Sequence, residues 1–107
     1  MAFELSPNIA IYVSDLEKAK TFYLETLGFL EIPGVGPEIE LKSGPNTLFL
    51  MEEESFLGAI HELFVDSVES ARDTLVMQGG EVVRWRGRGQ DCYIKDPFGV
   101  IFNLWEK

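Results

Sequence analysis

The sequence predicts an α+β fold in which two tandem βαβββ modules form a curved mixed sheet around a cleft, with the helices on the outer face. Three observations support this prediction. The chain has 107 residues, 46% of them hydrophobic, which suits one domain with its own core. Its second half repeats the first at a spacing of 52 residues. Each half has one helical hydrophobic pattern among four short strand-like segments.

The repeat is clearest where a helix is expected to begin in each half. Residues 14–17 (SDLE) and residues 66–69 (DSVE) each follow an apolar run. The same spacing matches Pro45 with Pro97. We therefore predict a single domain over residues 1–107, with a first module over 8–52 and a second over 59–106.

In the first module, apolar residues at both parities from Asn8 to Val13 predict a strand that is buried on two faces. Ser14 and Glu17 have the spacing of a capping box, which predicts the start of a helix. Gly28 is expected to end that helix. Gly- and Pro-containing turns then separate three strands, expected near 29–32, 38–42 and 47–52.

The second module repeats this order. A strand over 59–65 is expected to lead into a helix that is capped by Asp66 with Glu69 and ended by Gly79 and Gly80. Three further strands are expected at 81–86, 90–95 and 100–106.

Composition excludes several classes of function. The net charge is −9, from 18 acidic and 9 basic residues, which disfavours nucleic-acid binding because that requires a positive surface. No apolar run approaches the length of a membrane span, and no secretion signal is visible. The single cysteine, Cys92, allows no internal disulfide and suits a reducing compartment, so we expect a cytoplasmic protein. With no base or orienting partner visible, Cys92 is not proposed as a nucleophile.

Two motifs resemble those of a known superfamily. Residues 9–19 (IAIYVSDLEKA) are followed by Phe22-Tyr23 and by the LGF motif of 27–29, and residues 96–101 read DPFGVI. Together they resemble the vicinal oxygen chelate superfamily, which includes glyoxalase I, extradiol dioxygenases, fosfomycin resistance proteins and bleomycin resistance proteins. The resemblance covers Asn8 to Glu106 and implies the duplicated fold. Because proteins with this fold have many different functions, the resemblance implies little about the chemistry of this protein.

The resemblance also implies where a metal would bind. Enzymes of this superfamily hold a divalent ion with His and Glu side chains on the first and last strands of each half. The matching positions here are Asn8 and Asn103, and the repeat maps them to Ile60 and Met51. None of the four is a good ligand for the usual divalent ions. We therefore expect no metal ligands, no cofactor and no assigned catalytic residue, and the sequence leaves open whether the protein is an enzyme.

His61, the only histidine, lies one residue from a metal position. One residue along a strand reverses the face, so His61 is expected on the helix-covered side unless a β-bulge turns it. The alternative metal shell would combine His61 with Glu62, Glu52 or Glu40.

The strand residues that are expected to face the cleft are a mixture of aromatic and polar types, as in small-molecule sites. The same face could equally pack at a dimer interface. In this setting Glu62 would pair with a cationic ligand or have a raised affinity for protons. Trp85 is expected to pack in the core, and Arg84, Arg86 and Arg88 to line a solvated loop or hairpin. The predicted ligand-binding residues are Asn8, Tyr12, Phe49, Met51, Ile60, Glu62, Asn103 and Trp105.

Three functions remain open at this point. The first is a metal-free binding protein similar to the bleomycin-resistance branch, which would hold a small aromatic or cationic compound in an acidic cleft and sequester it without chemistry. The second is a metal-dependent lyase, isomerase or dioxygenase of the same superfamily, or a metal-free enzyme that uses Glu62. The third is a domain whose cleft has become a protein interaction surface. A homodimer is expected, and the sequence does not decide whether each cleft forms within one chain or across a swapped dimer.

Overall fold

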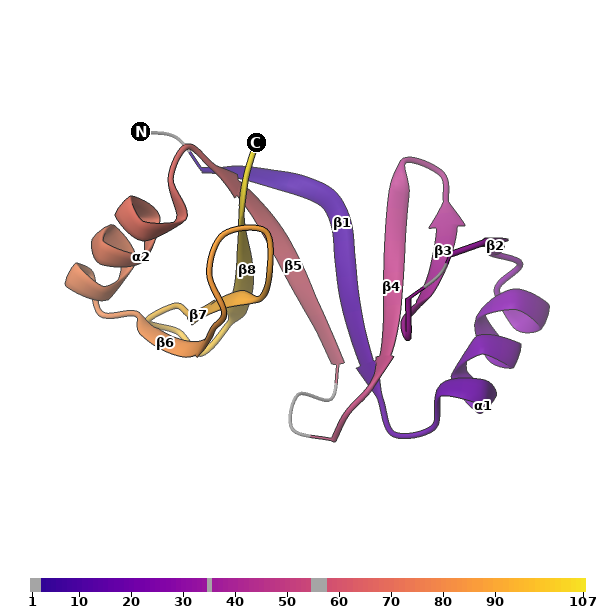
Figure 1. Ribbon diagram of the computed structural model, residues 1–107. Helices are drawn as coiled ribbons and strands as arrows, with labels where there is room; N and C mark the ends of the chain where they lie inside the picture. Colours follow the sequence, from indigo (N-terminus) through magenta and orange to yellow (C-terminus); the bar gives the residue numbers. More distant parts are fainter. Residues whose placement is uncertain (1–2, 35, 55–57) are drawn as a thin grey trace. The chain divides into compact units, whose positions relative to one another are not determined.

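The computed structural model describes residues 3–34, 36–54 and 58–107, and the chain divides into two compact units. The first unit is Pro7–Ala59, and the second is Ile60–Lys107 together with the start of the chain through Ser6. Each unit has a sheet with one helical segment packed against it (Figure 1).

The first unit has the strand order β2-β3-β4-β1. β1 and β4 are parallel, and the other neighbours are antiparallel. Its elements are β1 (Glu4–Val13), of which the part from Pro7 onward belongs to this unit, α1 (Leu16–Thr21), the π-helix η1 (Phe22–Thr26), β2 (Leu30–Ile32), β3 (Ile39–Ser43) and β4 (Asn46–Glu52).

The second unit has the order β5-β8-β7-β6, again with one parallel pair, β5 and β8. Its elements are β5 (Gly58–Val65), α2 (Val68–Met77), β6 (Glu81–Trp85), β7 (Cys92–Lys95) and β8 (Ile101–Glu106).

The eight strands follow the order β2-β3-β4-β1-β5-β8-β7-β6 in a mixed, open sheet. This order, with a helix after the first strand of each half, confirms the predicted α+β fold. β1 is longer than predicted, because it begins at Glu4 rather than Asn8. The predicted cleft would involve residues of both units and stays a prediction.

Both helices begin one residue later than the capping boxes predicted. The N-cap of α1 is Asp15, whose carboxylate accepts a hydrogen bond from Lys18 N at 3.0 Å. The N-cap of α2 is Ser67, whose hydroxyl accepts from Ser70 N at 3.2 Å. The predicted caps, Ser14 with Glu17 and Asp66 with Glu69, are therefore wrong. Each prediction fell on the first of two adjacent residues that are both favourable N-caps, so residue type alone could not choose between them.

A glutamate at the end of each parallel strand also binds the start of the helix. Glu52 Oε1 accepts from Leu16 N at 2.9 Å, and Glu106 Oε1 accepts from Val68 N at 3.0 Å. A carboxylate at a helix N-terminus satisfies an unpaired N–H and stabilises the dipole by about 0.3–1 kcal/mol. The two bonds tie the start of each helix to the end of a parallel strand in its own sheet.

The helix after β1 changes character halfway. α1 ends at Thr21 and continues as a π-helix over Phe22–Thr26, in which Leu27 N donates to Phe22 O at 3.2 Å. The sequence predicted one uninterrupted helix up to Gly28, so this change was missed. Gly28 does end the helical segment, with a φ of +74° that glycine adopts without strain.

Each unit buries one apolar face of its sheet beneath its helix. In the first unit Leu41, Leu48 and Leu50 form the buried cluster, with Leu16 and Ala19 of α1 packed on it. In the second unit Val68 and Ala71 of α2 pack with strand residues of the same face, namely Val65, Cys92, Ile94 and Leu104. The opposite face of each sheet is thereby left to carry other side chains.

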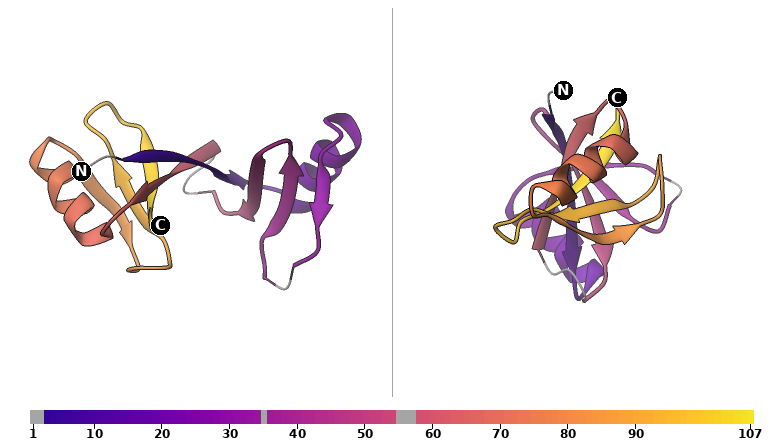
Figure 2. Two further views of the ribbon diagram at one scale, coloured as in Figure 1. Left: turned by 90° about the horizontal axis from the view of Figure 1, so that it is seen from above. Right: turned by 90° about the vertical axis from the view of Figure 1, so that its left-hand side faces the viewer.

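The two ends of the described chain meet within the second unit (Figure 2). Lys107 Nζ lies 2.9 Å from Glu4 Oε2, and Lys107 N donates to Val65 O at 3.3 Å. Among the described residues, no helix combines the length and apolarity needed to cross a lipid bilayer.

Candidate ligand-binding face

The face of the second sheet that is turned away from α2 carries a line of polar side chains. Strand register pairs Glu62 with Asn103, Asn103 with Tyr93, and Tyr93 with Arg84. Directly paired residues project on the same side of a sheet, and their sequence neighbours project on the other. We call Glu62, Asn103, Tyr93 and Arg84 the polar row. The neighbours Leu63, Cys92, Ile94, Leu104 and Trp85 all pack in the core with α2.

Glu62 is one end of the polar row. It is 9% exposed, and its Oε2 accepts a hydrogen bond of 2.7 Å from the Ser6 hydroxyl. Ser6 lies in the opening residues of β1 that belong to this unit. Carboxylates are rarely buried unless they are paired or hydrogen-bonded, and the Ser6 hydroxyl gives Glu62 such a partner.

Asn103 has a structural contact of its own. Its Oδ1 accepts from Cys92 N at 2.9 Å and so satisfies the first backbone donor of β7. The family resemblance would put a metal-ligating side chain at this position. Here the side-chain oxygen is occupied by a backbone N–H instead.

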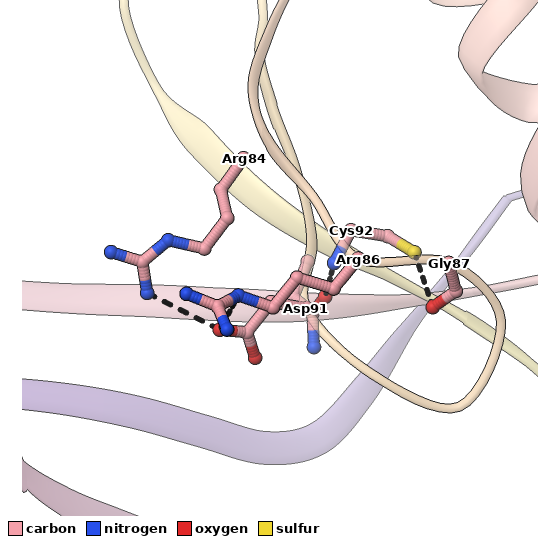
Figure 3. A network of polar contacts seen from close by, with 6 residues as sticks. Arg84, Arg86, Gly87, Asp91 and Cys92 are labelled. Carbon is pink, nitrogen blue, oxygen red and sulfur yellow. Dashed lines mark hydrogen bonds and ion pairs between the residues drawn. The ribbon is translucent and has the colours of Figure 1, made fainter.

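Arg84 is the other end of the row and shares a carboxylate with a neighbouring arginine (Figure 3). Arg84 Nη1 lies 3.2 Å from Asp91 Oδ2, and Arg86 Nε lies 3.9 Å from the same oxygen. The Arg84 guanidinium also lies over the Tyr93 ring, 5.6 Å from its centroid. Arg88 pairs with Glu106 at 2.6 Å. The arginines therefore belong to a hairpin, as expected, and each contacts a carboxylate.

Cys92 lies at the base of this hairpin on the α2 side of the sheet. Its thiol is within hydrogen-bonding distance of Gly87 O at 3.1 Å, as Figure 3 shows. Burial raises the pKa of the Cys92 thiol, and the charges of Glu69 and Asp91 raise it further. The neutral thiol is a poor nucleophile, and the sequence analysis did not propose Cys92 as one.

In the first unit, the predicted residues Tyr12, Phe49 and Met51 share the face turned away from α1. Met51 pairs with Tyr12, and Phe49 pairs with both Ala10 and Glu40. The alternating residues Leu48 and Leu50 belong to the core. Tyr12 is 3% exposed, while Phe49 and Met51 are half-buried. Asn8 pairs with Thr47 and lies two residues before Ala10 on the same face.

The register corrects one correspondence between the halves. Val13 pairs with Glu52, and its counterpart Val65 pairs with Glu106. Counting back along β4 and β8, the counterpart of Asn103 is Phe49 and not Met51. The spacing changes by one residue at each hairpin. Ile32 pairs with Glu40 and Glu40 with Phe49, whereas the matching pairs of the second unit, Arg84 with Tyr93 and Tyr93 with Asn103, each lie one position further apart in sequence. Phe49 has no metal-ligating atom, so the correction leaves both last-strand positions without a metal ligand of the usual kind.

His61 pairs with Phe102, which in turn pairs with the core residue Ile94. The register of β5 with β8 runs without a break from His61 to Val65. His61 therefore lies on the α2 side, as the sequence predicted, and is on the face opposite to Glu62. Among residues 3–34, 36–54 and 58–107, no group of three or more His, Cys, Asp or Glu side chains could hold a metal ion.

The remaining predicted residues lie in the second unit. Ile60 is 3% exposed at the start of β5, and Trp105 is 37% exposed and pairs with Phe64. Trp85 packs in the core beneath the Arg72 guanidinium, as expected. The sequence interpretation missed Ser6, Tyr93, Arg84 and Asp91 as neighbours of the site. Only the strand register brings them to the same face, and the register was not fixed by sequence.

Comparisons with known proteins identify the family. Residues 6–104 match the family model described as Glyoxalase/Bleomycin resistance protein/Dioxygenase superfamily. Among curated proteins, none matches the sequence significantly.

Several solved structures share the fold. A hypothetical protein from Bacillus halodurans C-125 is 18% identical with a TM-score of 0.70, over 100% of this chain and 96% of that one. A glyoxalase/bleomycin resistance protein/dioxygenase superfamily member from Vibrio splendidus 12B01 is 14% identical with a TM-score of 0.69, over 99% and 100%. An extradiol ring-cleaving dioxygenase from B. fuscum is 20% identical with a TM-score of 0.69, over 97% of this chain and 32% of that one.

Proposed function

Because the chain belongs to the Glyoxalase/Bleomycin resistance protein/Dioxygenase superfamily, we propose that it uses this fold to bind and sequester a small aromatic cation without a metal ion. The observation that carries the proposal is Glu62, a carboxylate at 9% exposure on the sheet face turned away from α2. A carboxylate in such surroundings favours a cationic partner, because a neighbouring positive charge stabilises its ionised form.

The metal-free part of the proposal is supported by the side chains at the family's metal positions. Ile60 and Phe49 offer no donor atom, and Asn8 and Asn103 offer only amides. Asn103 already accepts a backbone hydrogen bond through its oxygen. A divalent ion of the usual kind requires imidazole, carboxylate or thiolate ligands, and this set does not fit one.

The aromatic part of the proposal is supported by the side chains on the sheet face that carries Glu62. Phe64 and Trp105 pair on the same face of the second unit as Glu62. The Phe64 ring already has the Lys107 ammonium 5.1 Å from its centroid. Aromatic faces attract cations, by about 0.5–2 kcal/mol depending on how far the pair is desolvated. The net charge of −9 would add a long-range attraction for a cation.

The test is calorimetry with two isosteric probes, the hydroxyphenyl-trimethylammonium cation and neutral tert-butylphenol. They have the same shape and differ in charge. We expect the cation to bind at least about tenfold more tightly, a difference of about 1.4 kcal/mol, because only the cation pairs with Glu62. Equal affinities for the two probes would contradict the proposal.

A further inference from the structure

The tip of the β6–β7 hairpin lies against the Cys92 thiol. We call residues 87–90 of this hairpin the strap. Cys92 is fully buried at the start of β7, and its thiol lies 3.1 Å from Gly87 O, at the beginning of the strap (Figure 3). Core residues of the second unit, including Val68 and Leu104, pack with Cys92. The strap therefore forms part of the cover that keeps solvent from the only thiol of the chain.

The residues on either side of the strap are anchored independently of it. Before and after the strap, Arg86 N donates to Asp91 O at 2.7 Å, which joins the two arms of the hairpin. Cys92 N donates to Asn103 Oδ1 at 2.9 Å, which ties the start of β7 to β8. Neither bond involves a residue of the strap. The strap can therefore move while β6, β7 and β8 keep their places in the sheet.

The strap has the composition of a segment that opens easily. Its sequence, GRGQ, has no apolar side chain to bury. Gly87 has a φ of +94° and Gly89 a φ of +78°, a conformation that glycine adopts without strain. Arg88, Gly89 and Gln90 are exposed. Exposed segments that bury little apolar surface open locally at a lower free energy than the core on which they lie.

Arg88 ties the strap to the end of β8. Arg88 Nε lies 2.6 Å from Glu106 Oε2, and the other oxygen of Glu106 accepts from Val68 N at 3.0 Å. The Arg88 side chain is 76% exposed and that of Glu106 is 15% exposed, so water screens the pair mainly from the arginine side. Because the two carboxylate oxygens have separate partners, breaking the ion pair would leave the bond to the start of α2 in place.

The first unit shows that the fold does not require this ion pair. Glu52 has the place of Glu106 in the register and accepts from Leu16 N at 2.9 Å, at the start of α1. The matching hairpin lies between Ile32 and Ile39, and its sequence PGVGPE contains no Lys or Arg. The arginine is thus a feature of the second unit, which is also the unit that contains the thiol.

We propose that the strap opens as a local unit while the rest of the second unit stays folded, and that the Arg88–Glu106 ion pair is the latch that holds it closed over Cys92. Opening gives small reagents access to the thiol. The latch sets how often opening occurs, because the ion pair has to break before the strap can leave the sheet. Cys92 reports the opening and has no catalytic role in this inference, which needs no ligand and is independent of the proposed function.

The test is the rate at which Cys92 of the full chain reacts with dithiodipyridine, a neutral disulfide. The Cys92 sulfur bonds to one sulfur of the reagent, the S–S bond of the reagent breaks, and the released thiopyridine takes up the thiol proton and is measured by its absorbance. We expect Arg88→Gln to react at least about threefold faster than the unaltered protein, because an ion pair of this exposure is worth a fraction of a kcal/mol to about 1 kcal/mol.

Arg86→Gln is the matched control. It removes the same charge from the same hairpin, but Arg86 lies next to the strap and its guanidinium is 3.9 Å from Asp91 rather than near Glu106. Its rate should stay within about 1.5-fold of that of the unaltered protein, since the latch is intact. Thermal unfolding of both variants checks that they are folded.

Urea separates local opening from unfolding of the whole unit. A local opening exposes little new surface, so the reaction rate should stay nearly constant at urea concentrations well below the unfolding transition. If the thiol reacted only from the unfolded chain, the rate would rise steeply with urea from the lowest concentration, in parallel with the fraction of unfolded protein.

Either part of the inference can fail. Equal rates for Arg88→Gln and Arg86→Gln would show that Arg88 is not a latch. A rate that follows global unfolding in urea, or a thiol that reacts only beyond the unfolding transition, would show that the strap does not open by itself. None of these results bears on the affinity of the protein for aromatic cations, so failure here leaves the proposed function standing.

Discussion

Glu62→Gln is expected to weaken binding of the hydroxyphenyl-trimethylammonium cation by about tenfold to a hundredfold, which corresponds to about 1.4–2.8 kcal/mol. Gln is close in shape to Glu and can still accept the hydrogen bond from Ser6, so the fold should persist. The affinity for neutral tert-butylphenol should not change, because it has no charge to lose a partner. Calorimetric titration of both probes against the variant measures the two effects separately.

Glu40→Gln is the matched control for this substitution. Glu40 is half-buried on the face of the first sheet turned away from α1, where it pairs with Phe49. Both variants change the net charge from −9 to −8, since each removes one carboxylate. If they weaken cation binding equally, the attraction comes from the overall field of an acidic protein, and Glu62 has no specific role.

Leu104→Ala is expected to lower the free energy of unfolding by about 2–5 kcal/mol, because it leaves a cavity in the core of the second unit. Leu104 is 1% exposed and packs with Val68 and Ala71 of α2. The adjacent Trp105 points to the opposite face and is 37% exposed. Trp105→Ala should therefore cost less stability than Leu104→Ala, although it removes a larger side chain.

Chemical denaturation of the two variants compares these faces directly. The assignment of faces underlies the whole site, because Glu62 and Asn103 are placed by the same alternation as Trp105. A larger loss of stability for Trp105→Ala than for Leu104→Ala would mean that the site face, and not the helix-covered face, holds the main core.

Most of the fold could be predicted because the signals were local. Alternating apolar residues gave the strands, and glycines such as Gly28 and Gly79 ended the helical segments with positive φ. Helix starts were less certain, because Ser14 and Asp15 are both good caps and the choice depends on Glu52, which is distant in sequence. The π-helix after Thr21 left no recognisable sequence pattern.

The candidate site could be predicted only in part, because it depends on register between strands. A constant spacing of 52 residues matched the first strands correctly but slipped by two on the last strands, and so paired Asn103 with Met51 instead of Phe49. Each of the two later hairpins of the second unit adds one residue relative to its counterpart, and a constant spacing cannot reveal such a gradual slip. The predicted face of the sheet was unaffected by this slip, because side chains two residues apart on a strand point to the same face.

The partners of Glu62 were missed for the same reason. Ser6 precedes the predicted first strand, and its contact with Glu62 spans 56 positions. Arg84 joins the row only because the register shifts between Val82 and Arg84, an irregularity that inspection of the strand pattern did not reveal.

The central claim is that this member of the superfamily binds its ligand without a metal ion. Calorimetric titration of the purified protein with Mn²⁺, Ni²⁺ and Zn²⁺ tests it most directly, after dialysis against a chelator. Given the side chains of Asn8, Phe49, Ile60 and Asn103, we expect no stoichiometric binding at micromolar concentrations and no change in the affinity for the hydroxyphenyl-trimethylammonium cation. Binding of one ion per chain with a micromolar Kd, accompanied by tighter binding of that probe, would contradict the account.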